Sequence, residues 1–236
     1  MIGVVIPAHN EARYIRRCLT AIQQAASSPY LHGEPVKIIV VLDDCSDATG
    51  AVAQSLGVDT LAVTARNVGI ARAVGAQQCV NAGARWLAFT DADTVVADDW
   101  LVEQLRHRSD AVCGTIAIRH WRGRSPALKR DFETSYNDAE NHRHIHGANL
   151  GVSAEAYLRA GGFPPLTSSE DVALVKALQA GGSRIAWTAT PRVMTSARKS
   201  FRAPLGFGAT LLVVESQLAG NLSGGAAAQP LGVPAC

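Results

Sequence analysis

The sequence lacks the features that assign many chains to a class at once. It holds only five cysteines and no Cys-x-x-Cys pair, so we expect neither a disulfide framework nor a paired-cysteine zinc site. The net charge is only +2, which does not mark a nucleic-acid binder. The first residues show no signal peptide, and no run reaches the roughly 20 apolar residues of a membrane helix. These absences predict a reduced, cytoplasmic protein.

Glycine-rich phosphate loops are absent as well. The first predicted strand is followed by Pro7-Ala8-His9-Asn10-Glu11, not by the Gly-x-Gly-x-x-Gly turn of dehydrogenases, and no Gly-x-x-x-x-Gly-Lys loop occurs. The Gly-rich basic loop of sugar nucleotidyltransferases is also missing. A bound phosphate would have to be held through a metal ion or by Arg66 and Arg72.

What is present is a regular series of strands and helices. The chain has 236 residues and is 47% hydrophobic, enough for a substantial core. Nearly continuous apolar runs predict strands, and amphipathic segments between them predict helices. The predicted strands of the first half are 2–6, 36–42, 58–63 and 86–89, and its predicted helices are 10–26 (with Asn10 as the cap), 47–56 and 70–82. Such strand–helix units favour an α/β fold with a mostly parallel sheet and helices on both faces.

The second half is less regular. Segment 111–118 reads as an edge or mixed strand, and the pattern over 128–141 predicts a polar helix. Segment 204–218 reads as a further helix, while the Gly- and Ala-rich segment 221–236 predicts a flexible tail. Two capped helices (153–160 and 169–180, the second capped by Ser168 or Ser169) and a strand over 185–188 complete the expected elements. We expect one domain over 1–220, with a first half over 1–95 and a second over 96–220.

Polar residues follow each strand of the first half. Because parallel strands end at one edge of the sheet, these clusters should converge there, where ligands bind. The strand over 86–89 delivers Asp91 and Asp93, two carboxylates that repel each other. A divalent cation would relieve that repulsion, since hard cations take oxygen ligands. An ordinary acidic turn is the alternative.

Six segments occur along the chain in a recognisable order. They are Val4-Val5-Ile6-Pro7-Ala8-His9-Asn10-Glu11, Val40-Val41-Leu42-Asp43-Asp44-Cys45-Ser46-Asp47, Arg66-Asn67 to Gly75, Asp91-Ala92-Asp93, Gly147-Ala148-Asn149-Leu150-Gly151 and Glu170-Asp171. In this order they resemble the family 2 inverting glycosyltransferases of the GT-A fold, over roughly residues 1–200. The resemblance implies a GT-A, Rossmann-like central sheet with a smaller mixed sheet on the acceptor side.

The resemblance implies a donor site for a nucleotide-diphosphate sugar in 1–95 and an acceptor site in 96–220. Asp93, together with Asp91, matches the carboxylates that bind Mg²⁺ or Mn²⁺. The implied donor-binding residues are Pro7, Ala8, Asn10, Glu11, Asp43, Asp44, Arg66, Gly69, Arg72, Asp91 and Ala92. The implied acceptor-binding residues are Gly147, Ala148, Asn149 and Glu170. The implied activity is metal-dependent inverting transfer of one sugar to a hydroxyl acceptor, either saccharide or lipid-linked.

Asp171 matches the catalytic base of that family. From sequence alone, Glu170-Asp171 could instead simply cap the following helix. The family reading gives Asp171 the acceptor hydroxyl proton. A non-catalytic nucleotide-sugar-binding or scaffold protein with the same fold is the alternative function.

The sequence departs from the family pattern in two ways, and two further segments allow more than one interpretation. No histidine follows His146, so a histidine that many members use as a further metal ligand is missing. The Gln-x-x-Arg-Trp motif of processive synthases is absent.

His142, His144 and His146 alternate as on a strand and could bind a metal, line an acceptor pocket or lie on a solvated edge. The helix over 204–218, with Arg198, Lys199 and Arg202 before it, could lie on the inner face of a membrane or pack on the sheet.

Overall fold

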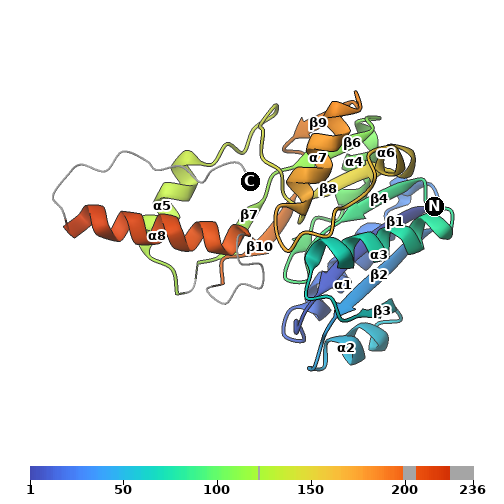
Figure 1. The fold of residues 1–236 in the computed structure, drawn as a ribbon, viewed down its shortest axis with the longest axis horizontal. Coiled ribbons are helices and arrows are strands. Elements are labelled where there is room, and N and C mark those ends of the chain that lie inside the picture. Colours follow the sequence, from blue (N-terminus) through green and yellow to red (C-terminus); the bar gives the residue numbers. More distant parts are fainter. Residues whose placement is uncertain (122, 199–205, 224–236) are drawn as a thin grey trace.

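The central sheet has seven strands in the computed structural model, which describes residues 1–121, 123–198 and 206–223. Its strand order is β3-β2-β1-β4-β8-β6-β9, and a smaller three-stranded sheet has the order β5-β10-β7 (Figure 1). The strands are β1 (Ile2–Ala8), β2 (Val36–Asp43), β3 (Asp59–Val63), β4 (Trp86–Phe89), β5 (Val95–Val96), β6 (Ala111–Gly114), β7 (Ala117–His120), β8 (Leu150–Ser153), β9 (Ile185–Thr188) and β10 (Val193–Ser196).

The four strands of the first half are parallel, as predicted. β1 pairs with β2 and β4, and β2 pairs with β3, all in parallel. β8 runs antiparallel to both β4 and β6, so the second half makes the sheet mixed. In the smaller sheet, β10 is antiparallel to β5 and parallel to β7, which confirms the predicted small mixed sheet.

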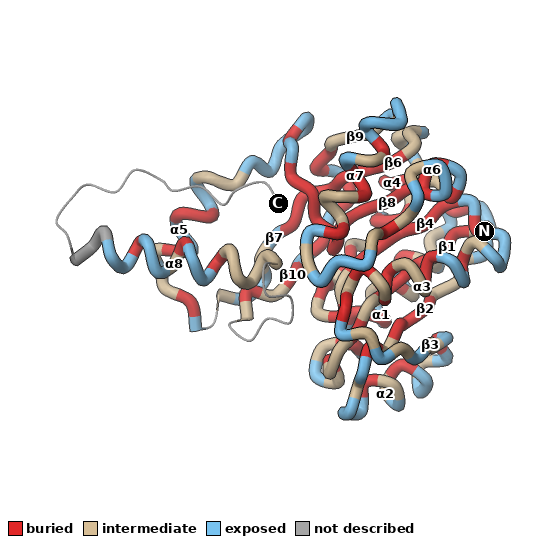
Figure 2. Tube along the Cα trace, viewed as in Figure 1, coloured by how far each residue is buried: buried red, intermediate tan, exposed pale blue. Residues whose placement is uncertain are grey.

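Helices cover both faces of the large sheet because the strands are apolar on both sides. In β1, Val4 and Ile6 belong to the core on the α1 face, whereas Val5 belongs to the core on the α3 face. The first core also takes in residues of α2 and α4, and the second those of α6 and α7 (Figure 2). The helices are α1 (Ile15–Ala26), η1 (Pro29–Leu31), α2 (Thr49–Ser55), α3 (Val68–Asn81), α4 (Trp100–Arg106), α5 (Pro126–Ser135), α6 (Ala154–Arg159), α7 (Glu170–Ala180) and α8 (Phe207–Ser223).

The structure corrects the predicted start of the first helix. α1 begins at Ile15 rather than at Asn10. Asn10 has a positive φ of 53°, and its side-chain oxygen accepts hydrogen bonds from the backbone N–H groups of Ser46 and Asp47 (2.8 and 3.2 Å). Asn10 therefore joins the loops after β1 and β2 instead of capping α1. α7 has Ser169 at its N-cap, as predicted, but the serine side chain makes no capping hydrogen bond.

Two predicted bounds in the second half are wrong. Segment 111–118 is divided between two strands in different sheets, although its first part, β6, has the mixed pairing that was predicted, antiparallel to β8 and parallel to β9. The helix predicted over 128–141 is α5, which ends at Ser135. Residues 142–146 belong to a loop that leads into β8, so the alternation of their histidines does not come from a strand.

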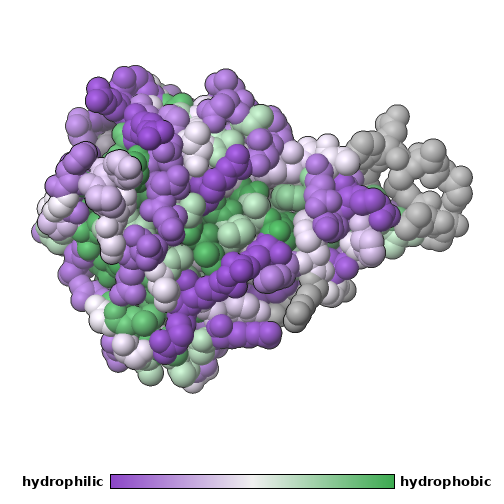
Figure 3. Space-filling view, turned by 180° about the vertical axis from the view of Figure 1, so that it is seen from behind, coloured by the Kyte–Doolittle hydropathy of each residue, from purple (hydrophilic) through white to green (hydrophobic). Residues whose placement is uncertain are grey.

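The last described helix is longer than predicted. α8 includes residues 221–223, which were expected in the flexible tail, while 224–236, Lys199, Arg202 and Pro204 lie outside the described residues. α8 packs on α5, and the two project together from the sheets as an arm (Figure 1). None of the helices within 1–121, 123–198 and 206–223 is both long and apolar enough to cross a bilayer. The reverse face carries apolar surface between hydrophilic borders (Figure 3).

Candidate functional site

A cavity of about 480 Å³ lies at the carboxyl ends of the parallel strands. The loops after β1, β2, β3 and β4 line it from the first half of the chain, and the segment before α7, the end of β10 and the start of α8 line it from the second half. The cavity brings together most of the residues selected from the sequence. These are Pro7, Ala8, Glu11, Asp43, Arg66, Arg72, Asp91, Ala92, Asp93, Gly147, Ala148, Glu170 and Asp171.

Asn10, Asp44, Gly69 and Asn149 do not line this cavity. Asp44 forms an ion pair with Arg66 (2.6 Å). Gly69 packs against the loop before α7, where a Cβ would lie 2.2 Å from the Pro164 carbonyl oxygen. These two residues hold the rim of the cavity from outside.

Asn149 is a buried structural residue, 1% exposed. Its side-chain oxygen accepts from Trp100 Nε1 (2.8 Å), and its amide nitrogen donates to the carbonyl oxygens of Thr115 and Pro191 (2.7 and 2.8 Å). Both the oxygen and the nitrogen of the side-chain amide are thus hydrogen-bonded within the fold. Asn149 therefore fixes the floor beneath Gly147 and Ala148.

Asp43 organises the loop after β3. Its carboxylate accepts hydrogen bonds from the backbone N–H groups of Ala65, Arg66 and Asn67 (2.8, 2.8 and 2.7 Å). Asn67 then caps α3 by accepting from Ile70 N–H (3.0 Å). One carboxylate thus shapes the cavity wall and starts the helix that carries Arg72.

Arg72 is buried in the cavity wall and joins its two halves. Its guanidinium forms ion pairs with Asp91 (2.6 Å) and with Glu170. Gly147 lies against this guanidinium, where a Cβ would be 2.2 Å from Nη1, so the close approach requires glycine. Burial raises the pKa of Glu170, with Arg72 opposing the shift and Asp171 adding to it.

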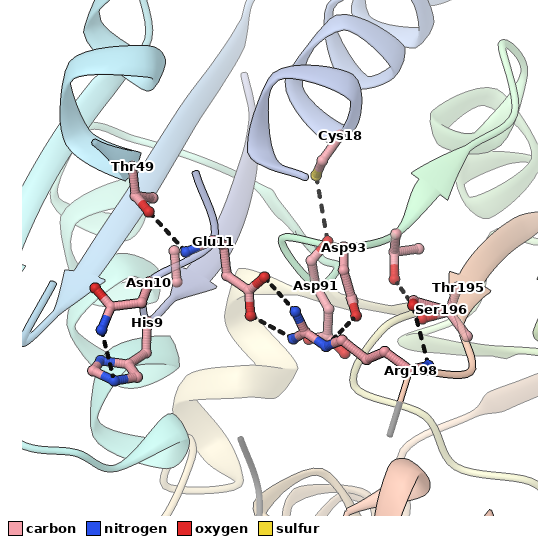
Figure 4. A network of polar contacts seen from close by, with 12 residues as sticks. His9, Asn10, Glu11, Cys18, Thr49, Asp91, Asp93, Thr195, Ser196 and Arg198 are labelled. Atoms are coloured by element: carbon pink, nitrogen blue, oxygen red, sulfur yellow. Dashed lines mark hydrogen bonds and ion pairs between the residues drawn. The ribbon is translucent and has the colours of Figure 1, made fainter. Parts of the chain in front are cut away.

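Asp93 lies on the opposite side of Asp91 from Arg72, among further charges. Burial raises the pKa of Asp93 to about 7; Arg198 opposes this shift, and the negative charges of Asp91 and Glu11 add to it. Arg198 makes a bidentate ion pair with Glu11 and also approaches Asp93, Nε to Oδ2 at 3.3 Å. Figure 4 shows the guanidinium between the two carboxylates.

Asp171 lies in the first turn of α7. Its Oδ2 accepts a hydrogen bond from the backbone N–H of Gly147 (2.6 Å). Glu170, next to it, points its carboxylate to Arg72 instead. The two neighbouring acids therefore have different environments, and only Glu170 among them is ion-paired with Arg72.

Several cavity residues were missed from the sequence. Arg198 was considered only as part of the basic run before the helix over 204–218, because its partners Glu11 and Asp93 are far away in the chain and sequence spacing carries no signal for such a contact. His9 donates to the Asp43 carbonyl oxygen (2.6 Å) and faces Arg66 through Nε2 (2.7 Å). The further lining residues that were missed are Asn67, Val68, Ala71, Ile116, Ile145, Thr167, Ser168, Ser169, Thr195, Ser196, Gly206, Phe207 and Gly208.

His142, His144 and His146 are buried and stack ring on ring, with centroids 5.5 and 5.7 Å apart. Only His146 reaches the cavity. Among the residues that the structure describes, no group of three or more His, Cys, Asp or Glu side chains could hold a metal ion. The histidine row thus gives no metal site of its own, and Asp91 and Asp93 would need ligands from a bound molecule.

Comparison with solved structures identifies the fold. S. aureus TarS residues 1–349, solved with UDP-GlcNAc, superposes with a TM-score of 0.65 at 17% identity, covering 87% of this chain and 61% of that one. The mannosyltransferase PcManGT from Pyrobaculum calidifontis, solved with GDP-Man and Mn²⁺, gives 0.62 at 19% identity, covering 97% of this chain and 66% of that one. The chain thus spans about three-fifths of TarS 1–349 and two-thirds of PcManGT. The shared fold is GT-A, as expected from the sequence.

Comparison by sequence gives the family. A search of curated proteins found no match. The family model for glycosyl transferase family 2 matches residues 3–159, which include the strands of the parallel half, the Asp91–Asp93 turn and the Gly147–Gly151 segment. That match spans well over half of the 236 residues, so the chain belongs to glycosyl transferase family 2.

Proposed function

We propose that the protein transfers one sugar, with inversion, from a nucleotide-diphosphate sugar to a hydroxyl acceptor in a metal-dependent reaction. The observation that carries this proposal is that Asp91, Asp93 and Asp171 line one cavity, although they come from the end of β4 and from α7. The two structural neighbours support a nucleotide-sugar donor, since one was solved with UDP-GlcNAc and the other with GDP-Man.

The donor half of the cavity lies over 1–95. Pro7 and Ala8 at the end of β1 give an apolar surface on which a base can pack, and Glu11 gives carboxylate oxygens that can accept from a ribose or base. Arg66 and Arg72 supply positive charge for a diphosphate. In this proposal Asn10, Asp43, Asp44 and Gly69 act by shaping the loops that hold the donor, because their contacts are with the protein.

A divalent metal ion fits the acidic side of the cavity. Burial raises the pKa of Asp93, Arg198 opposes this shift, and the charges of Asp91 and Glu11 add to it, so a bound cation would stabilise the ionised carboxylate. Asp93 and Asp91 would hold Mg²⁺ or Mn²⁺, and diphosphate oxygens and water would complete the oxygen shell that such cations require. When bound, the metal supplies positive charge to the leaving diphosphate. PcManGT was solved with Mn²⁺.

Asp171 is the proposed catalytic base. As the acceptor oxygen forms its bond to C1 of the sugar, the bond from C1 to the diphosphate oxygen breaks, and the hydroxyl proton passes to the Asp171 carboxylate. The hydrogen bond from Gly147 N–H to Oδ2 holds that carboxylate in the cavity. Glu170 cannot replace it, because its carboxylate is buried against Arg72. Glu170 instead acts as the acid that positions Arg72.

The acceptor is proposed to enter from the side formed by residues of 96–220. Ile116, Ile145, His146 and Phe207 line that part of the cavity, so an acceptor with apolar surface could be accommodated beside a saccharide. α8 also exposes Leu212 and Val213 (42% and 56%), which is compatible with contact to the inner face of a membrane. The assay below therefore includes a saccharide alcohol and a lipid-linked alcohol.

The test combines turnover with donor binding. UDP-, GDP- and dTDP-sugars are supplied with both acceptor types, with Mn²⁺ or with EDTA, and nucleotide affinity is measured by calorimetry. Asp171→Asn should lower kcat by about 10²- to 10⁴-fold while nucleotide affinity stays within a factor of two. Asp98→Asn, a change at an exposed residue outside the cavity, is the matched control and should behave as wild type. Nucleotide binding without turnover under every condition would favour the scaffold alternative.

A further inference from the structure

Arg198 occupies the acidic side of the donor cavity with all three of its guanidinium nitrogens. Nη1 and Nη2 donate to the two oxygens of Glu11, Nη1 at 2.6 Å, and Nε lies 3.3 Å from Asp93 Oδ2 (Figure 4). The side chains of Arg198, Glu11 and Asp93 are 17%, 4% and 13% exposed, respectively. Water therefore screens these contacts little. The guanidinium also lies over the Tyr14 ring, with Cζ 5.2 Å from its centroid.

The backbone at Arg198 is held independently of these side-chain contacts. Arg124 donates to the carbonyl oxygens of Ala197 (2.8 Å) and Arg198 (3.1 Å), and Arg198 N–H donates to Ser196 Oγ (3.3 Å). Rotation of the Arg198 side chain can therefore empty the space between Glu11 and Asp93 without loss of the surrounding structure.

Resting on the proposed function, we propose that Arg198 is an exchangeable cation of the donor site, which holds Glu11 and Asp93 until nucleotide and divalent metal replace it. A nucleoside at Glu11 competes with the bidentate pair that anchors the guanidinium. Once that anchor is lost, the longer Nε–Asp93 contact and the stacking on the Tyr14 ring remain. The metal can then take Asp93.

Competition of this kind couples the two ligands. In the absence of nucleotide, a metal ion must displace a guanidinium that Glu11 holds in place, so metal binding is weak. When the nucleotide already binds Glu11, the guanidinium is no longer anchored there, so metal binding is stronger. Linkage requires the metal to strengthen nucleotide binding by the same factor.

The test measures Mn²⁺ affinity by electron paramagnetic resonance, without nucleotide and with the nucleotide that binds in the calorimetric panel. In wild type, nucleotide should tighten Mn²⁺ binding, with a coupling factor in the range of about 5- to 150-fold. Arg198→Gln should bind Mn²⁺ more tightly than wild type without nucleotide and should show a smaller coupling factor. Arg192→Gln is the matched control, because Arg192 pairs with Asp138 and lies outside the cavity.

The coupling factor separates exchange from simple charge removal. If Arg198 only repelled the metal, Arg198→Gln would tighten Mn²⁺ binding equally with and without nucleotide, and an unchanged coupling factor would overturn the inference. Should wild type bind nucleotide but never Mn²⁺, the metal dependence in the proposed function fails as well. If Arg198→Gln does not fold, Glu11→Gln serves instead: it weakens the anchor and should likewise tighten Mn²⁺ binding without nucleotide, and no change would count against the inference.

Discussion

Three buried histidines determine how the stability of the fold changes as pH falls. Burial lowers the pKa of His142, His144 and His146, that of His146 to about 3, with the neighbouring histidines adding to the shift for His144 and His146. The unfolded chain protonates these groups near pH 6.5, whereas the folded chain protonates them only at lower pH. Since the unfolded state then binds more protons, the free energy of unfolding should fall as pH drops from 6.5 toward 3. Urea unfolding across this range measures the slope.

His144→Phe tests the origin of that slope. The His144 ring is buried and stacks on Tyr136 with centroids 4.2 Å apart. Phenylalanine keeps the stacking and removes the titration, so the variant should lose less stability on acidification, by up to about 1.4 kcal/mol per pH unit. His32→Gln, at an exposed position, should keep the wild-type slope. Equal slopes for wild type and His144→Phe would contradict this explanation.

Residue positions were predictable from the sequence where the topology alone decides them. Asp91 and Asp93 follow a buried strand, and the parallel sheet brings them to the same edge as Pro7 and Asp43. The direction of a side chain depends on the local backbone, which spacing does not encode. Asn10 and Asp44 have positive φ angles of 53° and 51°, and neither side chain lines the cavity.

At the scale of elements, the start of α3 is joined to the loop before α7. Asn67 Oδ1 accepts from Ile70 N–H, and its Nδ2 donates to the Pro165 carbonyl oxygen (both 3.0 Å). Asn67→Ala should lose the cap, worth about 0.5–2 kcal/mol of unfolding free energy, and should also lower kcat, because the freed loop leads to Asp171. Chemical denaturation and turnover measure the two effects.

Ser153→Ala is the control for Asn67→Ala. Ser153 caps α6 by accepting from Ala156 N–H (3.2 Å) and lies outside the cavity. Ser153→Ala should lower the free energy of unfolding by a similar amount and leave kcat unchanged. A kcat that falls equally in both variants would show that lost stability alone, rather than the α3–α7 link, controls turnover.

Most strands of the first half were predicted closely because β1, β2 and β4 are apolar on both faces and end in a polar cluster. The errors lie where tertiary contacts decide. β6 and β7 read as one strand, yet Thr115 and Ile116 between them bind Asp138 and the Tyr136 hydroxyl, which turns the chain from one sheet to the other. Such long-range contacts leave no periodic pattern in the sequence.

At the scale of the whole molecule, the α5–α8 arm has its own small core. Leu128, Phe132, Ala197, Leu211, Val214 and Leu218 form a cluster separate from the two cores of the sheet. Arg124 ties the arm together through an ion pair with Glu215 (3.1 Å). Phe207 at the start of α8 packs on this cluster and also lines the cavity. The arm should therefore open as a unit of lower stability than the sheet, while still shaping the acceptor side.

Leu211→Ala tests this division. Leu211 is fully buried in the arm core, and its truncation should cost about 2–5 kcal/mol in the opening of α5 and α8. Hydrogen exchange should speed up in those helices, while the amides of β1, β2 and β4 keep wild-type protection. Leu212→Ala changes the neighbouring residue, which is 42% exposed. It should leave hydrogen exchange at wild-type rates both in α5 and α8 and in the sheet strands.

Because Phe207 packs on the arm core and also lines the cavity, the KM for the acceptor should rise in Leu211→Ala, with little change in the KM for the donor. Equal loss of protection in β1 would instead show that arm and sheet unfold as one unit.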